Sequence, residues 1–224
     1  MKNIKLVVLD MAGTTVDEDN VVYKTLCNAV VKHGFEVDLD TVLKYGAGKE
    51  KLKAITDVLE FLNQPTDKAS MIFEEFSIDL KQAYQDLEVK PITGVTEFLE
   101  ELKAKKINIV LNTGYNSKTA NQLLDKLGWK KGNQYDALIT ADDVVNGRPS
   151  PEMILKAMEL FDVKDSKTVL KAGDSAIDIE EGKNANCGIT VGVLSGAQTK
   201  EELEAANPDY IFDTITQIRS LFVC

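Results

Sequence analysis

Six short apolar runs constrain the fold of this chain more than any other feature of its sequence. The runs are IKLVVLD, INIVLNTG, DALITADD, TVLKAGDS, GITVGVLSG and PDYIFD. Each ends in small or polar residues, and most are followed by a segment long enough for a helix. Strands that alternate with helices predict an α/β fold, in which helices wrap a Rossmann-like, doubly wound parallel sheet. Functional groups of such a sheet gather at the carboxyl ends of its strands.

A long helical insertion interrupts this alternation early. Nearly a hundred residues separate the first run from the second, and they contain four amphipathic segments: NVVYKTLCNAVVKHG, DLDTVLKYG, KEKLKAITDVLEFLN and TDKASMIFEEFSIDLKQAYQDL. The connector VKPITG, with Pro91 and Gly94, marks the exit of the insertion. We therefore predict a helical cap domain over residues 17–91 and a catalytic core formed by residues 1–16 and 92–224. A cap joined by two connections can hinge over a site and exclude water.

Composition and charge narrow the range of partners. The 224 residues carry a formal net charge of −10, which repels nucleic acid and anionic membranes. Apolar runs are far shorter than the roughly 18 residues of a membrane span, so we expect a cytoplasmic protein. The sequence leaves open whether it is a monomer or a homodimer. The three cysteines are scattered and form no CxxC pair, which disfavours a disulfide framework or a zinc site.

The ends of the first two runs carry groups suited to phosphate chemistry. In DMAGTTVD, Asp10 ends the strand and Gly13 permits a tight turn. A carboxylate at this place can attack phosphorus and form an aspartyl phosphate that water then hydrolyses. In NTGY, Thr113 offers a hydroxyl to a phosphate oxygen, and Gly114 belongs to the adjacent backbone whose N–H groups can do the same.

Later strand ends supply a cation and a pair of acids. Arg148 in GRPSPE offers a positively charged fork that can pair with phosphate and reduce its repulsion by Asp10. Asp174 and Asp178 in AGDSAIDIEEG follow a strand with four-residue spacing. Carboxylates and a phosphate oxygen are the hard ligands that Mg²⁺ prefers, so we predict Mg²⁺ as cofactor. Each group alone is weak evidence, but their order along the chain indicates phosphoryl transfer.

The order of these motifs resembles that of the haloacid dehalogenase superfamily, whose members are mostly phosphohydrolases. The resemblance covers the whole core, and the helical cap is of the type inserted after the first motif. It implies that Asp10 is the nucleophile and that Thr113 and Arg148 hold the transferring phosphoryl group. Thr14 in the same turn would donate to the phosphorylated aspartate or its neighbours. It also implies a Mg²⁺ site formed with Asp10, Asp174, Asp178 and the backbone carbonyl of Ala12.

Within the superfamily, the chain resembles the phosphonatase family. The similar strings are DMAGTTVD, NTGY, DDVVNGRPSPEM, GDSAIDIEEGKNA and TVGVLSG. Arg148 stands where most members of the superfamily carry lysine, and Ala12 stands where most phosphatases carry a second aspartate that protonates the leaving alcohol. Loss of a general acid typically costs about 10²–10⁴ in rate, so the pattern favours a leaving group that needs no proton from this position.

Three interpretations of Lys49 remain open from the sequence. In the phosphonatase family a cap lysine forms an imine with the substrate aldehyde, and the spacing from Gly46 to Lys49 in YGAGKEKLKAI is similar. In other members of the superfamily, a basic residue at this place contacts substrate phosphate. Lys49, Lys51 and Lys53 could also form a solvated face.

The sequence thus predicts a Mg²⁺-dependent, phosphonatase-like phosphohydrolase that acts through Asp10 on a small phosphorylated or phosphonate metabolite. Two alternatives stay open. One is a phosphonate-cleaving enzyme in the strict sense, which uses a Lys49 imine. The other is a catalytically impaired relative that only binds phosphate.

Overall fold

The computed structural model describes residues 4–47, 49 and 51–222. The chain divides into two compact units, Met1–Asp17 with Val89–Cys224, and Glu18–Glu88. We call the first the sheet unit and the second the helical unit. The helical unit lies within the interval 17–91 that the sequence assigns to a cap, and its function as a cap remains a prediction.

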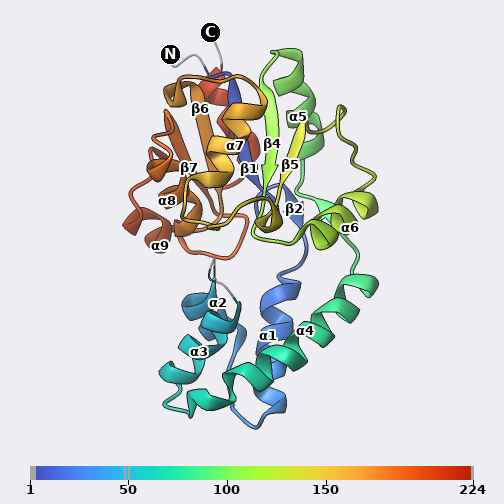
Figure 1. The fold of residues 1–224 in the computed structure, drawn as a ribbon, viewed down its shortest axis with the longest axis vertical. Helices are drawn as coiled ribbons and strands as arrows, with labels where there is room; N and C mark the ends of the chain where they lie inside the picture. Colours follow the sequence, from blue (N-terminus) through green and yellow to red (C-terminus); the bar gives the residue numbers. More distant parts are fainter. Residues whose placement is uncertain (1–3, 48, 50, 223–224) are drawn as a thin grey trace. The chain divides into compact units, whose positions relative to one another are not determined.

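A six-stranded parallel sheet forms the centre of the sheet unit (Figure 1). Its order is β5–β4–β1–β6–β7–β8. The strands are β1 (Leu6–Asp10), β4 (Asn108–Asn112), β5 (Ala137–Ile139), β6 (Val169–Gly173), β7 (Ile189–Val193) and β8 (Tyr210–Phe212). Each lies inside one of the six apolar runs, so the predicted α/β class is confirmed. The chain builds the sheet first on one side of β1 and then on the other, which places the topological switch point beside β1.

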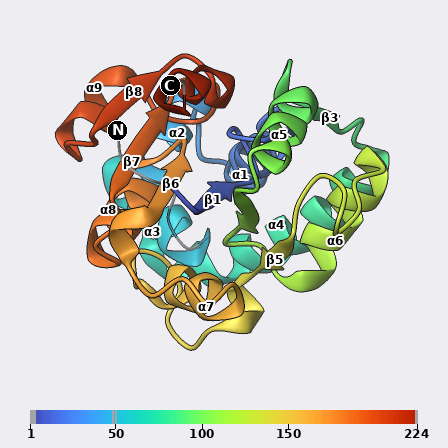
Figure 2. The same ribbon diagram turned by 90° about the horizontal axis from the view of Figure 1, so that it is seen from above.

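Helices cover both faces of the sheet. Figure 2 shows α5 (Val95–Ala104) and α7 (Glu152–Leu160) on opposite faces, and α8 (Ala176–Asn184) packs against β6 and β7. The remaining helices of the unit are α6 (Ser117–Leu127) and α9 (Lys200–Ala205). Short 3₁₀ segments, η2 (Ala141–Asp143), η3 (Ser166–Thr168) and η4 (Ile215–Phe222), complete the connections.

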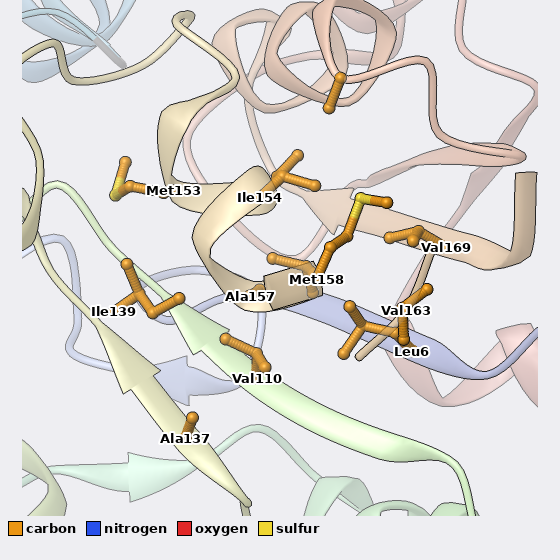
Figure 3. Close-up of a cluster of buried hydrophobic side chains, with 12 residues drawn as sticks. Leu6, Val110, Ala137, Ile139, Met153, Ile154, Ala157, Met158, Val163 and Val169 are labelled. Atoms are coloured by element: carbon orange, nitrogen blue, oxygen red, sulfur yellow. The ribbon is translucent and has the colours of Figure 1, made fainter. Parts of the chain in front are cut away.

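The face beneath α7 is a close-packed apolar layer (Figure 3). Leu6 and Val8 of β1 and Val110 of β4 point to this face, where they meet Ile154 and Met158 of α7. Because side chains alternate along a strand, residues of the same parity share this face. Lys171, two residues after the cluster member Val169, is therefore directed to the same face.

The described residues of the helical unit form four helices, α1 (Val21–Lys32), α2 (Leu39–Gly46), α3 (Lys51–Phe61) and α4 (Ala69–Asp86), with the 3₁₀ turn η1 (Thr66–Lys68) before α4. Helix α1 packs against α4, and α2 packs against α3. Two polar contacts add to the first of these: Lys32 Nζ forms an ion pair with Asp79 Oδ2 at 2.6 Å, and His33 Nε2 forms a hydrogen bond with Glu75 Oε2 at 2.8 Å. Gly48 and Glu50, within the predicted YGAGKEKLKAI motif, lie outside the described residues.

A two-stranded antiparallel ribbon lies where the chain leaves and re-enters the sheet unit. It joins β2 (Val16–Asp17) to β3 (Lys90–Pro91). Ile92 N also donates to Thr15 O at 3.2 Å. The two segments that connect the sheet unit to the helical unit are therefore paired with each other next to the loop after β1. No helix in the described part of the chain has both the length and the apolar character needed to cross a membrane.

Replacing Ile154 by alanine tests the apolar layer. Ile154 is fully buried, so Ile154→Ala should lower the free energy of unfolding by about 2–5 kcal/mol. Its neighbour Leu155 is 49% exposed on the same helix, and Leu155→Ala should change that free energy by no more than about 0.5 kcal/mol. Urea denaturation of the two variants measures the difference. Equal losses would show that the layer does not stabilise the sheet unit as described.

Candidate active site

The loop after β1 is fixed by its own hydrogen bonds. The Met11 carbonyl accepts from the backbone N–H groups of Thr14, Thr15 and Val16, and the Thr15 hydroxyl donates to Asp10 O at 2.9 Å. Gly13 has φ +72°, a left-handed conformation that favours glycine. A Cβ at this position would also lie 2.5 Å from Asp174 Oδ2, so the loop approaches the end of β6 too closely for a side chain.

Three carboxylates converge at this edge of the sheet. Asp10 ends β1, Asp174 follows β6, and Asp178 lies in the first turn of α8. One oxygen of each lies within 4.8 Å of one oxygen of each of the others, and all three side chains are buried. The predicted nucleophile and the predicted metal pair are thus brought together by the fold.

Arg148 joins two of these carboxylates. Its Nη1 lies 2.9 Å from Asp10 Oδ1 and also donates to Asp178 Oδ1. Asp178 receives further hydrogen bonds, since the Ser175 hydroxyl donates to its Oδ2 at 2.6 Å. Asp174 Oδ2 accepts from the backbone N–H of Ala197 at 2.7 Å. Arg148, the predicted phosphate-binding side chain, therefore lies against Asp10, the predicted nucleophile.

A buried lysine that the sequence interpretation missed stands behind this cluster. The Lys171 side chain on β6 is fully buried, and its Nζ lies 2.9 Å from Asp178 Oδ1 and 3.0 Å from Glu181 Oε2. It donates to Asn112 Oδ1 at 2.8 Å, and Asn112 Nδ2 donates to Glu181 Oε1 at 3.0 Å. A signal was available, because a lysine inside a strand that is covered on both faces requires a charged partner.

The electrostatics of the cluster differ from one carboxylate to the next. Burial and the nearby Asp10 and Asp178 carboxylates together raise the pKa of Asp174 to about 8. Burial likewise raises the pKa of Asp10 to about 6, although Arg148 opposes the shift. For Asp178 the effect of burial is outweighed by Lys171 and Arg148, which lower its pKa to about 2. Around Asp10 and Asp174, the positive charge of Arg148 is too small to offset the effect of burial on the two pKa values.

These residues fit a divalent cation. The donor set consists of hard carboxylate oxygens, which suit Mg²⁺, and the raised pKa of Asp174 reflects the burial and crowding of carboxylates, which a bound cation would offset. Ala12, whose backbone carbonyl the resemblance adds to this set, lies in the same loop, where it forms an isolated bridge with Val16. It provides no acid at that position.

The predicted phosphate-binding groups lie in the same unit. The Thr113 hydroxyl accepts from the backbone N–H of Tyr115 at 3.2 Å, directly after β4. A Cβ at Gly114 would lie 3.2 Å from Arg148 Nη2, so this turn runs beside the guanidinium. The Thr14 hydroxyl is fully buried and has no hydrogen-bond partner among the described residues. A buried hydroxyl without a partner is costly unless a ligand supplies one.

Lys49 lies in the helical unit, just before α3. Its Nζ lies 2.5 Å from Asp57 Oδ2, and Lys53 pairs with the other oxygen of the same carboxylate. Burial tends to raise the pKa of Asp57, but hydrogen bonds from Lys49 and Lys53 outweigh it and lower that pKa. Lys51 lies with its Nζ 4.9 Å from the centre of the Tyr23 ring, so the three lysines do not share one environment.

Comparison with known proteins identifies the family. Residues 7–193 match the family model described as haloacid dehalogenase-like hydrolase. The chain belongs to this family. This hydrolase is 31% identical, over 240 residues, to the phosphonoacetaldehyde hydrolase of Bacillus cereus, with 98% of this chain and 88% of the relative covered.

Solved structures of similar fold agree with this assignment. A putative phosphoglycolate phosphatase from Lactobacillus delbrueckii has a TM-score of 0.84 at 17% identity, with 100% of this chain and 99% of that chain covered. A phosphonoacetaldehyde hydrolase-like protein from Oleispira antarctica has a TM-score of 0.81 at 22% identity, with 98% and 91% covered. These structures show the likeness in fold, while the family match and the 31% identical relative support a phosphatase-type hydrolase related to phosphonoacetaldehyde hydrolase.

The raised pKa of Asp174 predicts a pH-dependent stability in the absence of metal. The folded state keeps a proton on Asp174 up to about pH 8, whereas the unfolded state releases it near pH 3.9. Stability from that proton is lost as the pH rises toward 8, with a slope of up to about 1.4 kcal/mol per pH unit. In EDTA, Asp174→Asn should therefore flatten the decline between pH 6.5 and 8 and be more stable than wild type at pH 8.

Urea denaturation at a series of pH values measures this slope. Asp162→Asn is the matched control, because Asp162 is exposed, its pKa is lowered by its ion pair with Lys164, and it is ionised in both states over this range. Addition of Mg²⁺ at pH 8 should raise the melting temperature of wild type but not of Asp174→Asn. Equal slopes in wild type and Asp174→Asn would contradict the assigned electrostatics.

Proposed function

We propose that this hydrolase is a Mg²⁺-dependent phosphohydrolase that works through an aspartyl phosphate on Asp10. The observation that carries the proposal is the buried cluster of Asp10, Asp174 and Asp178, with the Arg148 guanidinium in direct contact with Asp10. Mg²⁺ held by Asp10, Asp174, Asp178 and the Ala12 carbonyl would neutralise the substrate phosphate and the nucleophile. The substrate class is a small phosphorylated or phosphonate metabolite.

Each residue of the site has a separate role in the proposed reaction. An oxygen of Asp10 attacks phosphorus, the bond from phosphorus to the leaving group breaks, and the electron pair goes to the leaving group. Arg148, Thr113 and the backbone at Gly114 hold the phosphoryl oxygens, and the partnerless hydroxyl of Thr14 donates to them as well. Water then hydrolyses the aspartyl phosphate, which releases phosphate and restores Asp10.

The alanine at position 12 favours a substrate that leaves without a proton from this loop. Phosphonoacetaldehyde, the substrate named for the 31% identical relative, meets this condition if an amine first converts its aldehyde to an imine. Lys49 is the proposed amine: it condenses with the aldehyde and releases water. Cleavage of the P–C bond then leaves an enamine, which is protonated at carbon and hydrolysed to acetaldehyde. Asp57 is the adjacent carboxylate that can take the ammonium proton.

Phosphate release from purified protein tests the first step of this proposal. With Mg²⁺, wild type should release phosphate from phosphonoacetaldehyde or from a panel of acyl phosphates and phosphate esters. Asp10→Asn should reduce the rate to below about 1% of wild type, because the amide cannot attack phosphorus, while its circular dichroism spectrum stays unchanged. EDTA should abolish release by wild type.

Two outcomes would contradict the assignment. Activity of Asp10→Asn above that level would exclude Asp10 as nucleophile. Mg²⁺-dependent binding of beryllofluoride without phosphate release from any compound would instead identify a catalytically impaired phosphate-binding relative.

Borohydride trapping separates the two proposed roles of Lys49. During turnover of phosphonoacetaldehyde, mass spectrometry should find a reduced adduct on the peptide containing Lys49, and Lys49→Met should lose phosphonatase activity. Lys53→Met is the matched control, because Lys53 shares Asp57 with Lys49 but is not the proposed amine. If trapping fails and Lys49→Met only raises KM for phosphate compounds, Lys49 is a phosphate contact rather than an imine-forming residue.

A further inference from the structure

Lys171 is the buried charge that the proposed chemistry does not use. Its side chain has no exposure, and its ammonium contacts groups from two other elements, Asn112 at the end of β4 and both Asp178 and Glu181 on α8. All of these partners are buried too. A fully buried lysine loses the hydration of its charge and is retained only when such partners replace it.

The decisive contact is the one with Asp178. Oδ1 of Asp178 is shared between two cations, Lys171 Nζ at 2.9 Å and Arg148 Nη1. In the proposed reaction Arg148 holds a phosphoryl group, and a guanidinium engaged there would leave Asp178 with one cation fewer. Lys171 remains and holds the Asp178 carboxylate in its place, with Ser175 on the other oxygen. Without Lys171, Arg148 would be the only side-chain cation that the structure places on Asp178, and the carboxylate would retain it.

Asn112 extends this arrangement to the other side of the site. It accepts from Lys171 and donates to Glu181, and the next residue along the chain is Thr113, the proposed phosphate contact. Glu181 balances the charge of Lys171 at 3.0 Å. One buried ammonium thus joins the strand that presents Thr113 to the helix that presents Asp178.

We propose that Lys171 is a positioning residue that fixes Asp178 and so leaves Arg148 free to bind the phosphoryl group. This inference rests on the proposed function, since it concerns the same site. Lys171 touches no substrate in this role and acts through Asp178 and Asn112. Stability alone would not require it, because buried ion pairs can often be replaced by apolar groups of similar volume with no loss of stability.

The test replaces the buried pair as a unit. Lys171→Met/Glu181→Gln removes one charge of each sign, so the net charge of the cluster is kept. Asp178 loses Lys171 but keeps Arg148 as a partner. Lys167→Met is the control, because Lys167 is an exposed lysine just before β6 that donates to the Asn186 carbonyl. The measurements are melting temperature, kcat and KM for the substrate that wild type hydrolyses, and the Kd of beryllofluoride in Mg²⁺, a mimic of the phosphoryl group.

The proposal expects a folded double variant with a melting temperature close to that of wild type. Its kcat should fall roughly 10- to 100-fold with KM changed less than about threefold, a loss typical of residues that support a site from behind. The Kd of beryllofluoride should rise about tenfold, because Asp178 retains Arg148. Lys167→Met should match wild type in all measurements. If the double variant does not fold, Lys171→Gln/Glu181→Gln, which keeps hydrogen-bonding groups at both positions, replaces it with the same expectation.

Other results overturn the inference. A folded variant with wild-type kcat and beryllofluoride affinity would show that Lys171 is only a structural residue. If wild type itself neither releases phosphate nor binds beryllofluoride, the proposed function fails and the positioning role fails with it. The wild-type measurement therefore separates the two failures.

Discussion

Buried carboxylates are crowded at the ends of β1 and β6. The positions of the cations and loops around them depend on this crowding. Asp10, Asp174, Asp178 and Glu181 are all buried, and the described side chains nearby supply only two cations, Arg148 and Lys171. Both cations contact Asp178, so its pKa falls, whereas Asp10 and Asp174 are left with raised pKa values. This charge distribution is consistent with the proposed Mg²⁺ site.

Backbone geometry makes this crowding possible. A Cβ at Gly13 or Gly196 would lie 2.5 Å or 2.0 Å from Asp174 Oδ2, and a Cβ at Gly173 would lie 2.1 Å from Asp178 Cγ. Each glycine gives up side-chain packing so that the backbone can approach a carboxylate. The Ser195 hydroxyl adds a tie between the loop after β7 and the Gly13 carbonyl at 2.7 Å. The crowding around Asp10, the proposed nucleophile, therefore depends on the loops after β1, β6 and β7, which meet here, rather than on β1 alone.

Much of the fold and of the carboxylate cluster could be predicted from the sequence, because the sequence patterns that indicate them are local. Each apolar run contains one strand, and polar groups at the strand ends had to meet once the sheet was parallel. Lys171 escaped prediction because the run TVLKAGDS was interpreted by its apolar residues, although a lysine within it required a buried counter-charge. Glu181 follows Asp178 by three residues on the same helix, so the spacing alone predicts that the two side chains are neighbours.

The role of Lys49 could not be predicted in the same way. Its neighbour Asp57 lies two helical turns along the chain, and the pairing of one carboxylate with two lysines depends on how the segment before α3 folds. The amphipathic patterns of the helical unit carry little information about substrate, because substrate choice depends on a few side chains rather than on the pattern. The sequence thus predicts which groups of the sheet unit lie together at the candidate site, but it does not predict the substrate.

The claim that Asp10 is the nucleophile is tested most directly by quenching wild-type protein with acid during turnover and locating the phosphoryl group by mass spectrometry. The account predicts a hydroxylamine-sensitive phosphoryl group on the peptide that contains Asp10, because acyl phosphates react with hydroxylamine. A phosphoryl group on another residue would contradict the account. So would turnover in which the Asp10 peptide stays unmodified under conditions where the dephosphorylation step limits the rate.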